Sequence, residues 1–177
     1  CLAASSSAFL TIPLPRSAAG VSTTLAPRPR IILRRSTENE SAIVATKGNL
    51  DCHVILRGGT GNPNYSAKSV QETVEMLASA GLDGRVMVDC SHANSSKDHE
   101  KQAGVAKAIA EQVAEGSQGI FGVMLESFIV GGRQDNAASK ELTYGQSITD
   151  ACMSWDATVP VIEGLAEAVR KRRAAGS

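Results

Sequence analysis

Three short apolar runs, each followed by a helical pattern, constrain the fold of this chain more than any other feature. The runs are Cys52–Leu56, Arg85–Cys90 and Ile120–Leu125. They are nearly continuous in apolar residues, as is typical of parallel strands that are buried on both faces by helices. Apolar residues at helical spacing predict three helices, over residues 66–80, from a capping box formed by Ser95 and Asp98 up to Gly116, and around 160–173. The sequence therefore predicts an α/β fold with a parallel sheet.

The repeated strand–helix pattern fits either an open doubly wound sheet or a closed βα barrel. No Gly-x-Gly-x-x-Gly follows any of the strands and no Walker loop is present. This disfavours the nucleotide-binding forms of the open sheet. Residues 58–61 are rich in glycine, but so short a pattern more often marks a turn. The residues alone leave the choice between sheet and barrel open.

Residues 1–36 differ in composition from the rest, so we place the folded domain at residues 37–177. The segment holds five arginines, six serines and four of the six prolines, and no Lys, Asp or Glu. Its proline pairs prevent a long helix, and we expect an irregular or disordered basic segment. The composition fits a transit peptide, which would imply a plastid location. It fits equally an imperfect gene model, since the sequence begins at Cys1 rather than Met, and the location would then be cytoplasmic.

Charge and composition argue against two classes of partner. All 18 acidic residues but only 13 of the 18 basic residues follow residue 37, so the domain is a poor binder of phosphate backbones. Aromatic residues make up only 3% of the chain, which leaves little for base stacking. No run approaches the ~18–20 apolar residues that cross a bilayer. We therefore expect neither nucleic acid nor a membrane as a partner.

Polar side chains stand at or just past the end of each predicted strand, at Arg57, His92 and Glu126. In a βα barrel these strand ends converge on one mouth, so we expect the three side chains to meet there. Arg57 can clamp a phosphate or a carboxylate. His92 and Glu126 can bind a divalent metal or act as acid and base. Asp150, in the long loop after the third strand, can complete a set of imidazole and carboxylate ligands.

Each of these residues also has a structural interpretation. Arg57 would be an ion-pair partner at the surface. His92 and Asp150 would each cap the helix that follows. Glu126 is harder to explain in this way, because a buried carboxylate without a partner is costly.

Four segments that contain these residues together have a family resemblance. They are Asp51–Gly59 followed by Pro63-Asn64-Tyr65, Val88–Lys97, Gly122–Ser127 and Tyr144–Cys152. In sequence and in order they resemble the class I 3-deoxy-7-phosphoheptulonate synthases (DAHP synthases), over about residues 41–173. The resemblance implies an eight-stranded (β/α)8 TIM barrel, of which this chain matches the C-terminal three strand–helix units.

The same resemblance implies a function. It is a metal-dependent, aldol-like condensation of phosphoenolpyruvate with erythrose 4-phosphate that releases phosphate, the first step of the shikimate pathway to chorismate and the aromatic amino acids. By position, Arg57 matches the arginine that holds phosphoenolpyruvate. His92, which we also assign as catalytic, Glu126 and Asp150 match three of the four metal ligands. The implied ion is Mn, Fe, Co or Zn, and the full-length enzyme is expected to be a homo-oligomer.

Two departures from the family lead us to expect that the chain alone is inactive. Typical barrels need ~250 residues, and five strand–helix units are unmatched here. The fourth metal ligand of the family is a cysteine on the first strand, and Cys52, Cys90 and Cys152 occupy other positions. Gly131 also stands where the family usually carries glutamate. The alternatives are a pseudoenzyme or interaction module derived from the barrel, and a related octulosonate-type synthase.

Overall fold

A four-stranded sheet forms the centre of the structure. The computed structural model describes residues 21–23, 31–35, 41–45, 52–59, 62–136 and 141–176. The strands of the sheet are β1 (Val21–Thr23), β4 (Val54–Leu56), β5 (Val86–Asp89) and β6 (Ile120–Met124), in the order β1-β4-β5-β6. β4, β5 and β6 are parallel, and β1 pairs antiparallel with β4. The predicted parallel sheet is therefore confirmed.

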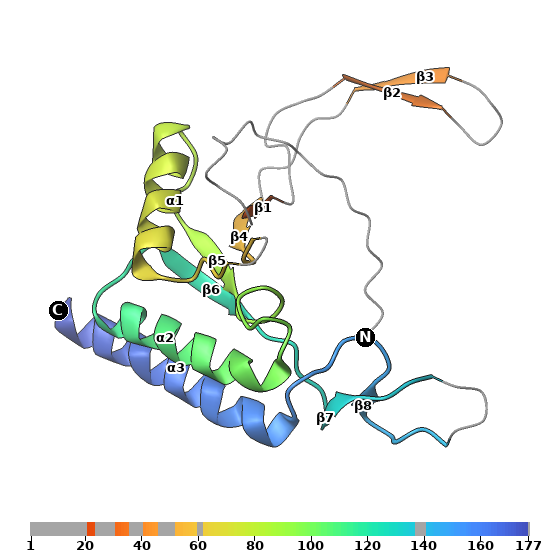
Figure 1. Cartoon of the computed structure of the whole chain (residues 1–177). Helices are drawn as coiled ribbons and strands as arrows, with labels where there is room; N and C mark the ends of the chain where they lie inside the picture. The colour runs from red at the N-terminus through yellow and green to blue at the C-terminus, as the bar shows by residue number, and fades with distance from the viewer. Residues whose placement is uncertain are drawn as a thin grey trace.

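Each parallel strand is followed by a helix, and in Figure 1 the three helices lie along one side of the sheet. The helices are α1 (Ala67–Ser79), α2 (Gln102–Ala114) and α3 (Trp155–Ala175), and a 3₁₀ turn (His99–Lys101) precedes α2. The predicted three strand–helix units are thus present. Among the described residues, we find no helix with the length and apolarity needed to cross a membrane.

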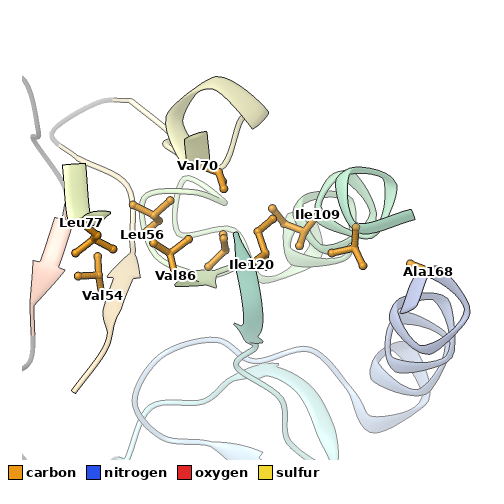
Figure 2. Close-up of a cluster of buried hydrophobic side chains, with 10 residues drawn as sticks. Val54, Leu56, Val70, Leu77, Val86, Ile109, Ile120 and Ala168 are labelled. Carbon is orange, nitrogen blue, oxygen red and sulfur yellow. The ribbon is translucent and has the colours of Figure 1, made fainter. Parts of the chain in front are cut away.

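The hydrophobic core lies between one face of the sheet and the helices. Alternate residues of the strands face the helices because side chains alternate across a strand. Figure 2 shows strand and helix side chains meeting in one cluster. The cluster consists of Val54, Leu56, Val70, Leu77, Val86, Val88, Ile109, Val113, Ile120 and Ala168. Each fully buried aliphatic side chain contributes about 1.5–3 kcal/mol to folding, so this face anchors the strands.

The other face of the sheet is only partly covered. Ile55 and Met87 are half-buried, and the side of β6 that carries Phe121 leaves this ring 44% exposed. The apolar strands led us to expect burial on both faces, but the helices cover one face only. A half-exposed apolar face remains, which agrees with the partial barrel that the family resemblance implies.

Two strands fall within residues 1–36, where we predicted irregular structure. β1 pairs with β4 from Val21 opposite Leu56 to Thr23 opposite Val54, and so covers one edge of the sheet. β2 (Ile31–Arg35) forms an antiparallel pair with β3 (Ser41–Ala45). The rest of residues 1–36 lies outside the described residues, and its interpretation as a targeting segment stays a prediction.

The region before the last helix also differs from the prediction. α3 begins at Trp155 and not near Pro160, because the Ser154 side chain caps it by accepting a hydrogen bond from the Ala157 backbone N–H at 3.2 Å. Pro160 lies inside the helix. In the segment that we expected to be a polar loop, β7 (Val130–Arg133) pairs in parallel with β8 (Gln146–Ser147).

Candidate active site

The ends of β4, β5 and β6 lie side by side and carry the polar residues that the sequence analysis selected. Leu56 pairs with Val88, and Asp89 pairs with Met124, so the three strands end at neighbouring positions. Arg57 follows β4 directly, while His92 and Glu126 follow β5 and β6 by three and two residues. The structure therefore places these three residues at one edge of the sheet.

The His92 ring lies between two carboxylates. Its Nδ1 atom is 2.8 Å from Oδ2 of Asp89, which is a hydrogen-bond distance. Its Nε2 atom is 3.5 Å from Oε1 of Glu126. The side chains of His92 and Glu126 are 22% and 23% exposed, so both remain accessible from solvent.

Asp89 joins Arg57 to His92. Its side chain is only 1% exposed. Oδ1 accepts a hydrogen bond from the Ser91 backbone N–H at 2.8 Å, and Oδ2 faces both His92 and the Arg57 Nε atom, which is 3.6 Å away. Burial raises the pKa of Asp89, and the charges of His92 and Arg57 oppose this rise. The buried carboxylate is thus held by donors on both of its oxygens.

Glu126 is fixed at its carboxylate and at its backbone. The Ser91 hydroxyl donates to Oε2 of Glu126 at 2.7 Å. Gln102, which is fully buried, accepts from the Glu126 N–H at 2.8 Å and donates to its carbonyl oxygen at 3.2 Å. The Met153 N–H donates to the same carbonyl at 2.9 Å. One hydrogen bond thus holds the carboxylate near His92, and three hold the backbone that carries it.

A buried asparagine ties the ends of β4 and β5 together. The Asn94 amide nitrogen donates to the carbonyl oxygens of Leu56 at 3.0 Å and Asp89 at 2.8 Å. Its Oδ1 atom accepts from the Asn64 N–H at 2.8 Å, and the Asn64 side chain in turn accepts from the Gly58 N–H at 2.7 Å. One side chain therefore fixes the relative position of the loops that carry Arg57 and His92.

The loop after β5 has an unusual backbone. His92, Ser96 and Lys97 adopt positive φ angles of 50°, 57° and 60°. Such conformations cost about 1–3 kcal/mol for residues other than glycine, and they persist where surrounding contacts impose them. The His92 side chain does not cap a helix, since Asp98 caps the 3₁₀ turn before α2. The capping interpretation of His92 is wrong.

Arg57 and Asp150 are less tightly held. The Arg57 side chain is 50% exposed, and its ion pair is with the buried Asp89, not with a surface carboxylate. Asp150 is exposed in the segment between β8 and α3, and Ser154 caps α3 in its place. In the described part of the chain, no three or more His, Cys, Asp or Glu side chains form a group that could hold a metal. The structure therefore unites His92 with Glu126 but does not bring Asp150 to them.

The pair formed by His92 and Glu126 fits two ligands of one divalent ion. Their facing atoms are 3.5 Å apart, which is too long for a strong hydrogen bond. Two ligands with bonds of ~2.1 Å at a tetrahedral angle lie ~3.4 Å apart. Imidazole and carboxylate together suit Mn, Fe, Co or Zn. The geometry and the donor types both agree with a metal at this position.

Sequence reasoning missed the residues that hold this site. They are Asp89, Ser91, Asn94 and Gln102. Asp89 could have been found, because it ends an apolar strand and the argument about a costly buried carboxylate applies to it as it does to Glu126. The other three are polar residues of common type, and nothing in their spacing reveals which backbone groups they meet.

Cys90, which follows Asp89, is fully buried beside α2. Burial, helped by the negative charge of Asp89, raises the pKa of this thiol to about 12. We therefore expect Cys90 to be alkylated by iodoacetamide much more slowly than the partly exposed Cys152, as read by peptide mass spectrometry. Equal rates for the two residues would contradict the burial of Cys90.

The raised pKa of Cys90 also predicts a pH dependence. In the unfolded chain a thiol ionises near pH ~8.5, but in the folded chain it keeps its proton up to about pH 12. The free energy of unfolding should therefore fall as pH rises through this window, by at most ~1.4 kcal/mol per pH unit. Urea unfolding at pH 8 and pH 10 measures the fall. It should be smaller in Cys90→Ala.

Comparisons with known proteins show the family of the chain. Residues 20–163 match the model of the DAHP synthetase I family, a match that begins inside the segment that we placed outside the domain. The phospho-2-dehydro-3-deoxyheptonate aldolase of Haemophilus influenzae is 50% identical over 149 residues, which are 84% of this chain and 41% of that protein. The Phe-sensitive aldolase of Escherichia coli K12 is 50% identical over 145 residues, covering 82% of this chain and 41% of the relative.

A solved structure gives the same result in three dimensions. The phospho-2-dehydro-3-deoxyheptonate aldolase from Francisella tularensis SCHU S4 superposes with a TM-score of 0.73 at 48% identity, covering 83% of this chain and 42% of that chain. The described sheet and helices are thus part of a (β/α)8 barrel. The chain spans about 40% of the length of the relatives that it matches. On the family match and these identities together, the chain belongs to the DAHP synthetase I family.

Proposed function

We propose that this chain supplies part of the active site of a 3-deoxy-7-phosphoheptulonate synthase, which condenses phosphoenolpyruvate with erythrose 4-phosphate and releases phosphate. The observation that carries the proposal is the meeting of Arg57, His92 and Glu126 at adjacent strand ends. The buried Asp89 links the first two, and Ser91 and Gln102 orient the third. Substrates and metal at one rim are what this chemistry requires.

In this proposal each residue has a separate task. Arg57 holds the phosphate or carboxylate of phosphoenolpyruvate, because its guanidinium is half exposed and makes one ion pair. His92 and Glu126 are metal ligands through their facing Nε2 and Oε1 atoms. When bound, a Mn, Fe, Co or Zn ion acts as a Lewis acid on the aldehyde of erythrose 4-phosphate. His92 is also the catalytic residue of this set.

Asp150 is proposed as the third ligand. Its support is the position of its segment, because Ser127 forms a parallel bridge with Met153, and the Met153 N–H donates to the Glu126 carbonyl. These contacts place Met153, three residues after Asp150, alongside the Glu126 loop. The exposed Asp150 side chain makes no competing ion pair within the described residues.

The first test of the proposal is metal binding by the chain itself. Titration calorimetry with Mn²⁺ or Zn²⁺ should show a single site, and His92→Ala should weaken it at least ~100-fold, because one of few ligands is lost. His99→Ala is the matched control, since His99 lies in the 3₁₀ turn and no predicted role attaches to it. Equal affinity in the His92 and His99 variants would remove His92 from the ligand set.

The second test is turnover. We predict no phosphate release by the chain alone with both substrates and Mn²⁺, because it spans about 40% of its relatives. A chimera in which residues 20–163 replace the matching segment of the Escherichia coli Phe-sensitive enzyme should be active, and His92→Ala should abolish this activity. An active chimera with His92→Ala would contradict the proposal, and turnover by the chain alone would refute the predicted inactivity. Light scattering of the chimera tests the expected homo-oligomer.

A further inference from the structure

We propose that Asp89 is a positioning residue that fixes the tautomer of His92, so that the Nε2 lone pair of the ring faces Glu126. The inference concerns the metal-free chain as well as the loaded site. Only its consequence for metal binding rests on the proposed function. In this assignment Asp89 is neither a substrate ligand nor a metal ligand, and it acts through the His92 ring.

The two contacts of the His92 ring determine the tautomer. An ionised carboxylate accepts hydrogen bonds and donates none, so at 2.8 Å from Asp89 the Nδ1 atom must carry the proton. In a neutral ring the other nitrogen, Nε2, then has a lone pair. This lone pair faces the Glu126 carboxylate at 3.5 Å, across a separation that suits an intervening cation better than a direct bond.

The Asp89 carboxylate is itself held in position by contacts to both of its oxygens. Its Oδ1 atom is engaged by the Ser91 N–H at 2.8 Å, and its side chain is only 1% exposed. Its Oδ2 atom receives His92 and, at 3.6 Å, the Arg57 guanidinium. Rotation of the carboxylate would exchange equivalent oxygens and would change nothing at the ring. Both oxygens of Asp89 must therefore act as acceptors, Oδ1 for the Ser91 N–H and Oδ2 for the protonated Nδ1 of His92.

An asparagine cannot meet that requirement. Its amide offers one oxygen and one NH₂ group, whereas Ser91 N–H and the protonated Nδ1 of His92 both need an acceptor. With the amide oxygen on Ser91, the NH₂ group faces the ring, which must then present a lone pair at Nδ1 and place its proton on Nε2. That proton points at Glu126 and occupies the position proposed for the ion.

The test compares tautomers by ¹⁵N NMR in the full 177-residue chain without metal. Long-range ¹H–¹⁵N spectra are recorded at rising pH until the ring shifts stop changing, so that the ring is neutral, and His92→Ala assigns the signals. We expect a protonated Nδ1 in the unmodified chain and a protonated Nε2 in Asp89→Asn. We also expect the Mn²⁺ affinity of Asp89→Asn to fall ~10–100-fold. Asp83→Asn, an exposed carboxylate paired with Arg85, is the control that should change neither measurement.

Every outcome of this experiment supports or overturns the inference. A neutral His92 with its proton on Nε2 in the unmodified chain overturns it, and so does Asp89→Asn with Nδ1 still protonated. If Asp89→Asn does not fold, the spectrum of the unmodified chain still distinguishes the two tautomers. A chain that shows the expected tautomer but binds no Mn²⁺ would count against the proposed function and leave the role of Asp89 intact.

Discussion

Gly58→Ala should destabilise the chain by about 3–5 kcal/mol, through left-handed backbone strain together with overpacking. Gly58 has a φ of +79°, a left-handed backbone conformation that is unfavourable for residues with a Cβ atom. A Cβ atom there would also lie 2.7 Å from the Ala93 Cβ and 2.9 Å from the Asn94 backbone nitrogen. These neighbours belong to the loop that holds His92, so the β4 and β5 loops would be forced apart.

Gly81→Ala is the matched control for this substitution. Gly81 has a similar φ of +70°, but nothing lies within 4 Å of a Cβ added there. Backbone strain alone should cost about 1–2 kcal/mol. Urea unfolding of both variants separates the cost of backbone strain, which both share, from the cost of the close contacts, which only Gly58→Ala creates. Equal losses in the two variants would show that the approach of Gly58 to Ala93 and Asn94 contributes nothing.

Asn94→Ala should cost about 3 kcal/mol, because three hydrogen bonds are lost and two buried carbonyl oxygens lose a donor. The lost donor bonds run to Leu56 and Asp89, and the lost acceptor served the Asn64 N–H. The loss should appear in the free energy of unfolding. On the proposed function, it should also appear as a weaker affinity for Mn²⁺, because the Arg57 and His92 loops lose their common support.

Asn62→Ala provides the comparison for Asn94→Ala. Asn62 is an exposed residue of the same type in the loop after β4. Its replacement should change the free energy of unfolding by less than ~0.5 kcal/mol, as is usual for surface substitutions. A loss at Asn94 as small as the loss at Asn62 would mean that the link between the strand ends is not needed for stability.

The strand–helix units could be predicted from sequence because their causes are local. Continuous apolar runs and helical spacing located β4, β5 and β6 and the helices that follow, with errors of a few residues at the ends. The start of α3 differs from the expected position near Pro160, because the Ser154 cap starts the helix at Trp155. β1 escaped prediction because its partner, β4, is distant in the sequence.

In the candidate site, too, the residues with a local sequence signal could be predicted and those that depend on tertiary contacts could not. Arg57, His92 and Glu126 could be selected because each follows a predicted strand, and the structure places His92 and Glu126 together. The roles of Asp89 and Gln102 could not be predicted. Asp89 acts on the His92 ring in the following loop, and Gln102 binds backbone groups of Glu126. Such contacts are set by tertiary packing, which no spacing rule records.

The hydrogen bonds that orient the His92 ring and the Glu126 carboxylate begin and end within residues 57–126, with donors and acceptors on Asp89, Ser91 and Gln102. One further bond, from the Met153 N–H to the Glu126 carbonyl oxygen, comes from outside this stretch. The geometry of this rim is therefore inherited mainly with one continuous stretch of sequence, to which the segment before α3 adds one bond. A segment of this kind can be moved between related enzymes, or made separately, with its internal alignment already in place.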